Sequence, residues 1–276
     1  MKRYLDDKYF KRFIKDFQFL FKLIRDSNGE LDLRLRANYF NIYFRGNSMA
    51  KIQFSKTDYQ IAIHKKFAEG VFDHDQRFNK AMKTVNRLEG YNLYSISPEL
   101  LHPFLQRKNL NKLASNVKSV NYGEEIVFEQ ALITDNMNRE DYLIIDRQVT
   151  ERELGRRRLD LLSLRQLESN AYAFEVIELK LGNSSELKAA VDEQLEGYIK
   201  HIKANMVQWK ESYEKVYQQL KQAELFDKPS FADIEIVPEV SGRIVVVGYS
   251  GIARKNIEML KQDYPDLKVE LRDFLL

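Results

Sequence analysis

The stretch Arg156–Lys180 restricts the possible fold more than any other part of the chain. It reads RRRLDLLSLRQLESNAYAFEVIELK, with two apolar runs, Leu159–Leu164 and Ala171–Leu179, around a polar break at Arg165–Asn170. Runs of this length on either side of a turn-like break predict two strands joined by a hairpin. Because each run is almost entirely apolar, we expect both strands to lie inside a sheet that is covered on both faces.

Three charged residues interrupt these apolar runs: Asp160, Glu178 and Lys180. An ionised group inside a sheet costs several kcal/mol unless it is paired or coordinated. Side chains two residues apart on a strand share a face, so Glu178 and Lys180 point the same way, about 7 Å apart. If the neighbouring strand aligns Asp160 with them, two carboxylates and an ammonium converge. Carboxylate oxygens suit a hard divalent cation, and we therefore expect Mg²⁺ or Mn²⁺.

The context of these residues resembles the PD-(D/E)XK nuclease superfamily. Asp160 is followed, after a hairpin, by Glu178-Leu179-Lys180, and a helix that contains Glu125 precedes both. Downstream, Gln194 to Tyr198 is similar to the QxxxY motif of RecB-type nucleases. The run from Ile144 to Lys180 is similar to nuclease domains of the archaeal NucS type. Leu159 stands where the signature has Pro, which many members lack, and the resemblance covers about residues 120–275.

This resemblance implies an α/β domain over residues 119–276, with a restriction-endonuclease-like αβββαβ core and a mixed central sheet. It also implies a metal-dependent nuclease, a hydrolase of phosphodiester bonds with DNA as the expected substrate. The residues to which it assigns roles fall into three groups. The expected metal ligands are Asp160, Glu178 and Glu125, the further catalytic residues are Lys180 and Gln194, and the expected nucleic-acid contacts are Arg156, Arg157, Arg158 and Tyr198.

Two other functions stay open. The first is a nucleic-acid-binding or regulatory module that keeps the nuclease fold without the chemistry, and the presence of every expected carboxylate disfavours it. The second is a partner-binding protein that uses the apolar face of a helix at Met206–Phe226. That segment carries Trp209, Tyr213 and Tyr217 near one side, and this pattern indicates either a long packing helix or the contact of a homodimer.

Charge divides the chain into two halves. Residues 1–123 hold 23 Lys and Arg against 12 Asp and Glu, a balance of +11, and residues 124–276 hold 21 against 29, a balance of −8. We therefore expect a basic α+β domain at 1–118 that holds a nucleic acid or another partner, and a boundary near Ser119–Gly123. Within the basic half, Arg34, Arg36 and Lys51 are candidates for the solvent-exposed face of an antiparallel meander, where they could contact phosphates of a nucleic acid. A solvated surface without such a role is the open alternative.

Periodicity predicts the remaining elements. The N-terminal half should hold a helix over the first 26 residues, four strands at 30–36, 39–45, 49–54 and 59–64, and two helical pieces in 75–116 that break near Gly90. The C-terminal half should hold a helix at 125–133, a strand at 142–149, helical pattern from 186 to about 226, strands at 244–247 and 267–271, and a helix at 253–262.

The chain has no Cys, and its four His are scattered without ligand spacing. The absence of Cys is typical of a reducing cytosol and excludes a disulfide scaffold. The N-terminal residues carry charge in place of an apolar signal region, and no apolar run reaches 18 residues. We therefore expect a cytoplasmic protein with no membrane partner and no structural zinc.

Overall fold

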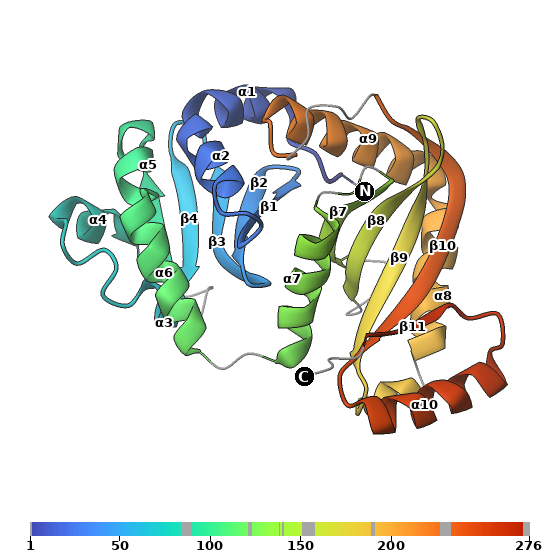
Figure 1. Ribbon diagram of the computed structural model, residues 1–276. Coiled ribbons are helices and arrows are strands. Elements are labelled where there is room, and N and C mark those ends of the chain that lie inside the picture. The colour runs from blue at the N-terminus through green and yellow to red at the C-terminus, as the bar shows by residue number, and fades with distance from the viewer. Residues whose placement is uncertain are drawn as a thin grey trace. The chain divides into compact units, whose positions relative to one another are not determined.

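The chain forms two compact units in the computed structural model, which describes residues 2–83, 90–120, 123–137, 139, 141–150, 158–188, 191–226 and 233–272. The N-terminal unit comprises Lys2–Tyr122 and Gln218–Pro229, and the C-terminal unit comprises Gly123–Tyr217 and Ser230–Leu276 (Figure 1). The first division at Tyr122 and Gly123 lies within four residues of the expected domain boundary at 118–119. The return of Gln218–Pro229 to the N-terminal unit was not anticipated from the sequence.

The N-terminal unit is built on a six-stranded sheet in which every neighbouring pair is antiparallel. The four predicted strands are confirmed: three differ from their predicted bounds by one or two residues, and the strand at 59–64 matches them. The order across the sheet is β1 (Leu31–Arg36), β2 (Tyr39–Phe44), β3 (Asn47–Phe54), β4 (Tyr59–His64), β6 (Tyr91–Ile96) and β5 (Met82–Lys83).

The prediction of helices throughout residues 75–116 was wrong for the segment 91–96, which is a strand. Within the described part of this range, residues 91–96 form β6 rather than a helix, and each residue of β6 pairs with one of β4, from Tyr91 with His64 to Ile96 with Tyr59. A partner strand distant in sequence decides this segment, because its short apolar alternation fits either element. The helices of this part are α3 (Lys65–Ala68), α4 (Gln76–Ala81), α5 (Pro98–Phe104) and α6 (Arg107–Ser119).

Aromatic side chains fill the core of the N-terminal unit. The predicted first helix is two helices, α1 (Asp7–Asp16) and α2 (Gln18–Arg25), which are separated at Phe17. Phe13 and Phe17 both pack against Phe40 of β2, with ring centroids 5.0 and 4.9 Å apart, and Phe17 meets Tyr59 edge-on at 5.1 Å. These rings are therefore core residues.

The C-terminal unit holds a five-stranded mixed sheet. Its order is β11 (Val269–Arg272), β10 (Glu235–Val247), β9 (Ala171–Leu181), β8 (Arg158–Glu168) and β7 (Tyr142–Thr150). The strands β7, β8 and β9 pair antiparallel, which confirms the predicted hairpin, while β10 runs parallel to both β9 and β11. The whole chain is thus a mixed α+β protein with one antiparallel and one mixed sheet.

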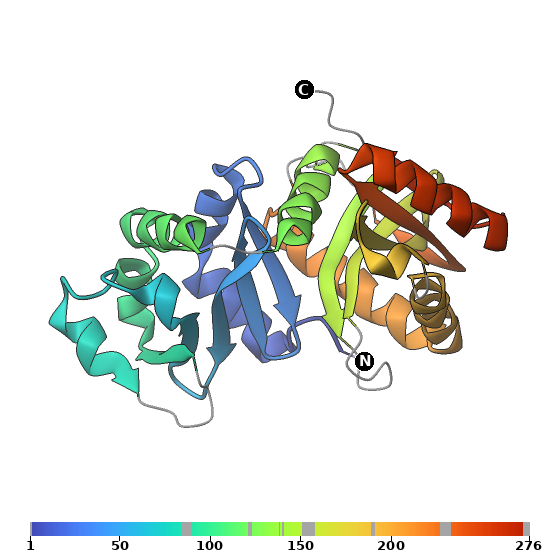
Figure 2. The same cartoon turned by 90° about the horizontal axis from the view of Figure 1, so that it is seen from below.

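Helices cover both faces of this second sheet, as expected from its apolar strands (Figure 2). On one face α7 (Glu124–Asn136) places Leu132 and Ile133 in a buried cluster with Ile177 and Leu179. On the other face α8 (Val191–Ala204) and α9 (Met206–Gln222) pack, and the rings of Trp209 and Phe174 lie 6.0 Å apart. The helix α10 (Ser250–Asp263) follows β10 and leads to β11.

The apolar face of α9 is a packing face within the chain. Trp209, Tyr213 and Tyr217 are all fully buried, and Trp209 and Tyr213 both contact Phe174 of β9. This face is therefore not available as the homodimer contact considered from the sequence. No helix in the described ranges is both long and apolar enough to cross a membrane.

Candidate active site

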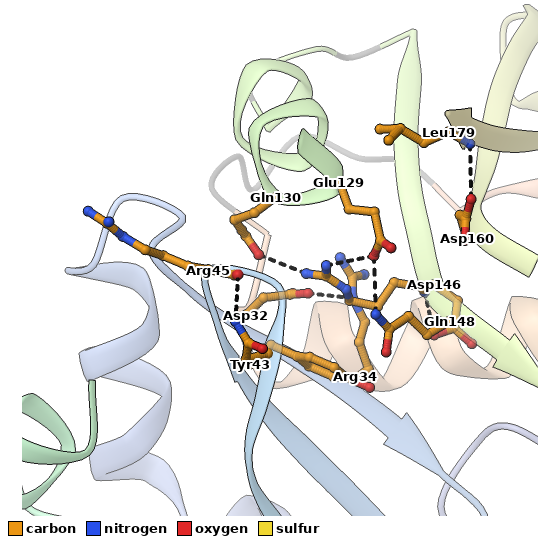
Figure 3. Close-up of polar contacts among 12 residues, drawn as sticks. Asp32, Arg34, Tyr43, Arg45, Glu129, Gln130, Asp146, Gln148, Asp160 and Leu179 are labelled. Atoms are coloured by element: carbon orange, nitrogen blue, oxygen red, sulfur yellow. Dashed lines mark hydrogen bonds and ion pairs between the residues drawn. The ribbon is translucent and has the colours of Figure 1, made fainter. Parts of the chain in front are cut away.

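The predicted acidic residues meet where the pairing of β8 and β9 ends. The last backbone pair at this end joins Leu161 to Ile177. Beyond it, the Asp160 side chain takes over, because its Oδ2 accepts a hydrogen bond from the backbone N–H of Leu179 at 3.0 Å (Figure 3). The strand end is thus closed by a carboxylate rather than by a backbone carbonyl.

Glu178 lies beside Asp160 and is completely buried. Its Oε1 accepts hydrogen bonds from Lys180 Nζ at 2.9 Å and from Gln194 Nε2 at 2.8 Å. Its Oε2 is buried with no hydrogen-bond donor against it in the described part of the chain. Burial and then the neighbouring Asp160 charge raise the pKa of Glu178 well above its ordinary value. Burial likewise raises the pKa of Asp160.

Lys180 bridges two carboxylates. Its Nζ lies 2.9 Å from Glu178 Oε1 and 2.8 Å from Glu186 Oε2. Burial alone would lower the pKa of Lys180, but the charge of Glu178, the hydrogen bond to Glu186 and the charge of Asp160 outweigh burial and raise it. The side chain is therefore a fixed ammonium ion at neutral pH.

Glu186 is a site residue that the sequence did not reveal. Ser184 Oγ accepts a hydrogen bond from the Glu186 backbone N–H at 3.3 Å, and the Glu186 side chain turns to Lys180. Its carboxylate is half exposed, with 51% of the side chain accessible, and it comes from a short 3-10 helix, Ser185–Lys188. The only available signal was its position six residues after Lys180.

The helix α7 brings Glu125 to the same strand end. Glu125 Oε1 accepts a long hydrogen bond, 3.4 Å, from the backbone N–H of Leu181. Burial raises the pKa of Glu125, the Lys180 charge opposes this increase, and the charges of Asp160 and Glu186 add to it. Glu125 therefore belongs to the same electrostatic cluster as the two strand carboxylates.

The QxxxY pair on α8 supports Glu178 from the opposite side. Gln194 Nε2 donates both to Glu178 Oε1 and to the Tyr198 hydroxyl, the latter at 3.0 Å. Burial raises the pKa of Tyr198 to about 12, with the hydrogen bond from Gln194 opposing and the Glu178 charge adding to this increase. Tyr198 is only 1% exposed, so its side chain is not accessible here for the expected contact with nucleic acid. It acts on Glu178 through Gln194.

A second buried ion pair lies one helical turn along α7. Arg147 of β7 is completely buried and donates to Glu129 Oε2 at 2.9 Å and to Gln130 Oε1 at 2.7 Å. Figure 3 shows Glu129 and Gln130 on α7 beside Gln148, which reaches Glu129 Oε2 at 3.4 Å. Burial raises the pKa of Glu129 to about 7, with Arg147 opposing and the Asp160 charge adding to the increase.

Of the three consecutive arginines expected to bind nucleic acid, the structure describes only the last, Arg158. Arg156 and Arg157 lie outside the described residues. Arg158 is exposed at the start of β8, and its charge lowers the pKa of Asp160 against the larger effect of burial. Among these three arginines, Arg158 is the described one, and its charge acts on Asp160.

The expected basic face of the N-terminal meander is not observed. Arg34 and Arg36 are each only 6% exposed, and Arg34 Nε is bound by Asp32 Oδ2 at 2.9 Å. Lys51 is partly exposed, with its Nζ 4.0 Å from the centre of the Tyr39 ring. The prediction that Arg34 and Arg36 lie on a solvated face was wrong, because the strand residues Leu33–Arg36 are buried on both sides.

The residue types at this site fit a hard divalent cation. Asp160, Glu178 and Glu125 offer only oxygen donors, one of them the buried Glu178 Oε2 without a hydrogen bond. Burial raises the pKa values of all three carboxyl groups, and a divalent cation would favour their ionised forms. Within the described residues, no group of three or more His, Cys, Asp or Glu side chains stands arranged as metal ligands. In this structure the positive charge beside Glu178 is the Lys180 ammonium, 2.9 Å from Glu178 Oε1.

Comparison with protein-family models, with curated proteins and with solved structures finds no match to this chain.

Proposed function

We propose that the C-terminal unit is a metal-dependent nuclease of the PD-(D/E)XK type, with a restriction-endonuclease-like core and nucleic acid, foremost DNA, as substrate. The observation that carries this proposal is the buried convergence of Asp160, Glu178 and Lys180 where the β8–β9 ladder ends. The antiparallel β7, β8 and β9 followed by a parallel β10, with α7 before them and α8 between β9 and β10, is compatible with the proposed core.

In this proposal Asp160, Glu178 and Glu125 would hold Mg²⁺ through hard oxygen ligands. The bound ion would polarise the scissile phosphate and lower the pKa of a coordinated water. Gln194 keeps the Glu178 carboxylate in one orientation, and Tyr198 in turn fixes the Gln194 amide. Both are positioning residues, since Tyr198 is buried and Gln194 touches the site only through Glu178.

Lys180 has the electrostatic role. Its ammonium is held 2.9 Å from Glu178 and is only 8% exposed, so it faces little competition from water. A fixed positive charge in such a place stabilises negative charge that develops on the phosphate in the transition state. Arg158, exposed at the entrance of β8, would hold a backbone phosphate of the substrate.

The decisive experiment combines cleavage and metal binding. Wild-type protein should cleave labelled single-stranded, duplex or branched DNA with Mg²⁺ or Mn²⁺ and not with EDTA. Asp160→Asn and Glu178→Gln should abolish cleavage and weaken Mn²⁺ binding in calorimetry, because each keeps its volume and removes a ligand charge. Glu196→Gln on α8 is the matched control, because Glu196 is 58% exposed and pairs with Lys200.

Two results would contradict the proposal. Undiminished cleavage in Asp160→Asn or Glu178→Gln would place the reaction elsewhere in the chain. DNA binding by the wild type without cleavage under any of these metals would favour a module that keeps the fold and has lost the chemistry.

A further inference from the structure

The helix α6 carries a charge distribution unlike that of any neighbouring segment. No Asp or Glu occurs between Glu99 and Glu124, and α6 lies wholly inside this stretch. Its buried residues are Asn109, Leu110, Leu113 and Val117, which form the inward face. Its exposed residues are Arg107, Lys108, Asn111, Lys112, Ser115, Lys118 and Ser119. Four of these seven are cations, and the other three are neutral hydrogen-bonding side chains.

The cations of this outward face of α6 are largely unneutralised. Arg107 pairs with Asp26 of the same unit at 3.2 Å. Lys108 and Lys112 form no ion pair with a described carboxylate, and Lys118 lies over the Phe44 ring, 5.5 Å from its centre. An ammonium over a ring keeps its full charge. Three lysines are therefore available to an anionic partner along a helix that is about 20 Å long.

The position of the charges works against the stability of the isolated helix. Arg107 and Lys108 stand in the first turn of α6, where no acidic residue is present, and the N-cap Gln106 makes no side-chain hydrogen bond. Cations at this end repel the positive pole of the helix dipole and weaken the helix. An anion bound there would offset this repulsion.

We propose that the outward face of α6 is the surface on which the N-terminal unit holds the sugar–phosphate backbone of a nucleic acid. Lys108, Lys112 and Lys118 neutralise phosphates, and Asn111, Ser115 and Ser119 donate hydrogen bonds to phosphate oxygens between them. The inference takes the class of partner from the proposed function, because an acidic catalytic half repels a polyanion and needs a basic surface to retain it.

The composition of the face favours a nucleic acid over a lipid surface. A helix that binds in a membrane interface buries an apolar face in the lipid. In α6 the apolar residues Leu110, Leu113 and Val117 are already buried in the core of the unit. The neutral residues left outside are small and polar, as expected for contacts to phosphates.

The adjoining cavity does not hold the phosphates. A hollow of about 310 Å³ lies beside α6, and its lining includes Arg107, Asn111, Ser115 and Lys118 of the helix as well as Asp26 and Glu30. Two carboxylates on its walls disfavour a phosphate inside it. The backbone therefore follows the exposed side of α6 outside this hollow, where Lys108 and Lys112 lie. Asn111, Ser115 and Lys118 border the hollow and are also exposed to solvent, so the backbone contacts them from that side.

The test compares two triple substitutions that remove the same charge from the full chain. The first is Lys108→Gln with Lys112→Gln and Lys118→Gln on α6. The control is Lys8→Gln with Lys11→Gln and Lys15→Gln, three exposed lysines on one side of α1 in the same unit. Binding of labelled duplex and single-stranded DNA is measured in EDTA over a salt series, and circular dichroism melting checks that both variants fold.

The α6 variant should bind DNA at least about tenfold more weakly than the wild type at low salt. Its log–log salt slope on duplex DNA should be flatter by up to about 2.7, or about 0.9 for each lost contact. The α1 variant should stay close to the wild type in both respects. Equal losses in the two variants would show an effect of net charge alone, and an unchanged α6 variant would assign binding elsewhere. Either result overturns the inference.

Anionic lipid vesicles are the remaining probe. Tighter binding to vesicles than to DNA through the same three lysines would replace the nucleic acid with a membrane and overturn the inference. The outcome is separable from that of the proposed function. Binding in EDTA that depends on α6, without metal-dependent cleavage, sustains this inference and defeats the nuclease. If the α6 variant binds DNA like the wild type and still cleaves it with metal, this inference is overturned and the proposed nuclease function is sustained.

Discussion

Lys180 has two carboxylate partners, and its removal should separate a catalytic role from a structural one. In Lys180→Ala we expect cleavage to fall by about 10²-fold or more, as for the loss of one group that stabilises transition-state charge. Mn²⁺ binding, measured by calorimetry, should persist or tighten, because a positive charge 2.9 Å from Glu178 is gone. Lys188→Ala, an exposed residue of the same 3-10 helix as Glu186, is the control. Collapse of metal binding would instead show that Lys180 holds the carboxylates in place.

Glu129 should make stability depend on pH near neutrality. Burial raises its folded-state pKa to about 7 from an ordinary value of 4.5, so the folded protein binds a proton that the unfolded chain releases. Its contribution to the free energy of unfolding is therefore full below about pH 4.5 and is lost as pH rises to about 7, by about 3 kcal/mol. Urea unfolding between pH 5 and 8 should show a flatter dependence in Glu129→Gln. Parallel curves for this variant and the wild type would contradict the assignment.

At the scale of the element, α10 fixes the end of β9. Gly182 N donates to Val247 O, and Gly182 O accepts from Asn256 Nδ2, both at 3.0 Å. A Cβ on Gly182 would lie 2.6 Å from Ala253 Cβ and would also strike the Gly248 carbonyl. Gly182→Ala should therefore destabilise the protein by about 1–3 kcal/mol, and should weaken cleavage because the strand end carries Glu178 and Lys180.

Gly251 provides the control for this strand-end substitution. It lies in the first turn of α10, where an added Cβ meets nothing within 4 Å. Gly251→Ala should be neutral or stabilising by up to about 1 kcal/mol, because alanine has the higher helix propensity. Thermal melting compares the two variants. An unchanged Tm in Gly182→Ala would mean that β9 and α10 can separate without loss.

At the scale of the whole molecule, the C-terminal part of the chain contributes a segment, Gln218–Pro229, to the N-terminal unit. Gln219 is only 8% exposed and holds the backbone of Leu5, accepting from its N–H at 2.9 Å and donating to its carbonyl at 2.8 Å. Gln219→Ala should cost about 2 kcal/mol, because two buried backbone groups lose their partners. Hydrogen exchange at the Leu5 amide should accelerate. Gln218→Ala, at an exposed neighbour, should change neither quantity.

This interleaving bears on how the units can be tested. A fragment that starts near Ser119 would retain Gln218–Pro229 without the residues that they contact in the N-terminal unit, Leu5 and Arg25 among them. Substitutions in the full chain are therefore the sharper probe of the role of the basic half.

The sequence alone determined the strands and most helices, because local patterns specify them. Strict alternation at Leu31–Arg36 and Tyr59–His64 and the apolar runs around Arg165–Asn170 predicted strands that the structure has. The spacing of Glu178 and Lys180 on one strand fixed their common face. Residues 91–96 were missed because six residues of mixed pattern carry too little information without the partner strand β4.

Only the tertiary structure decided how these pieces act together. Burial of Arg34 and Arg36 depends on what covers both faces of β1, and no local pattern reports it. The hydrogen bond from Leu179 N–H to Asp160, and the turn of Glu186 toward Lys180, depend on strand register and loop path. Side-chain period fixes the face on which a charge lies, whereas the partner that charge meets is set by packing between segments far apart in the chain.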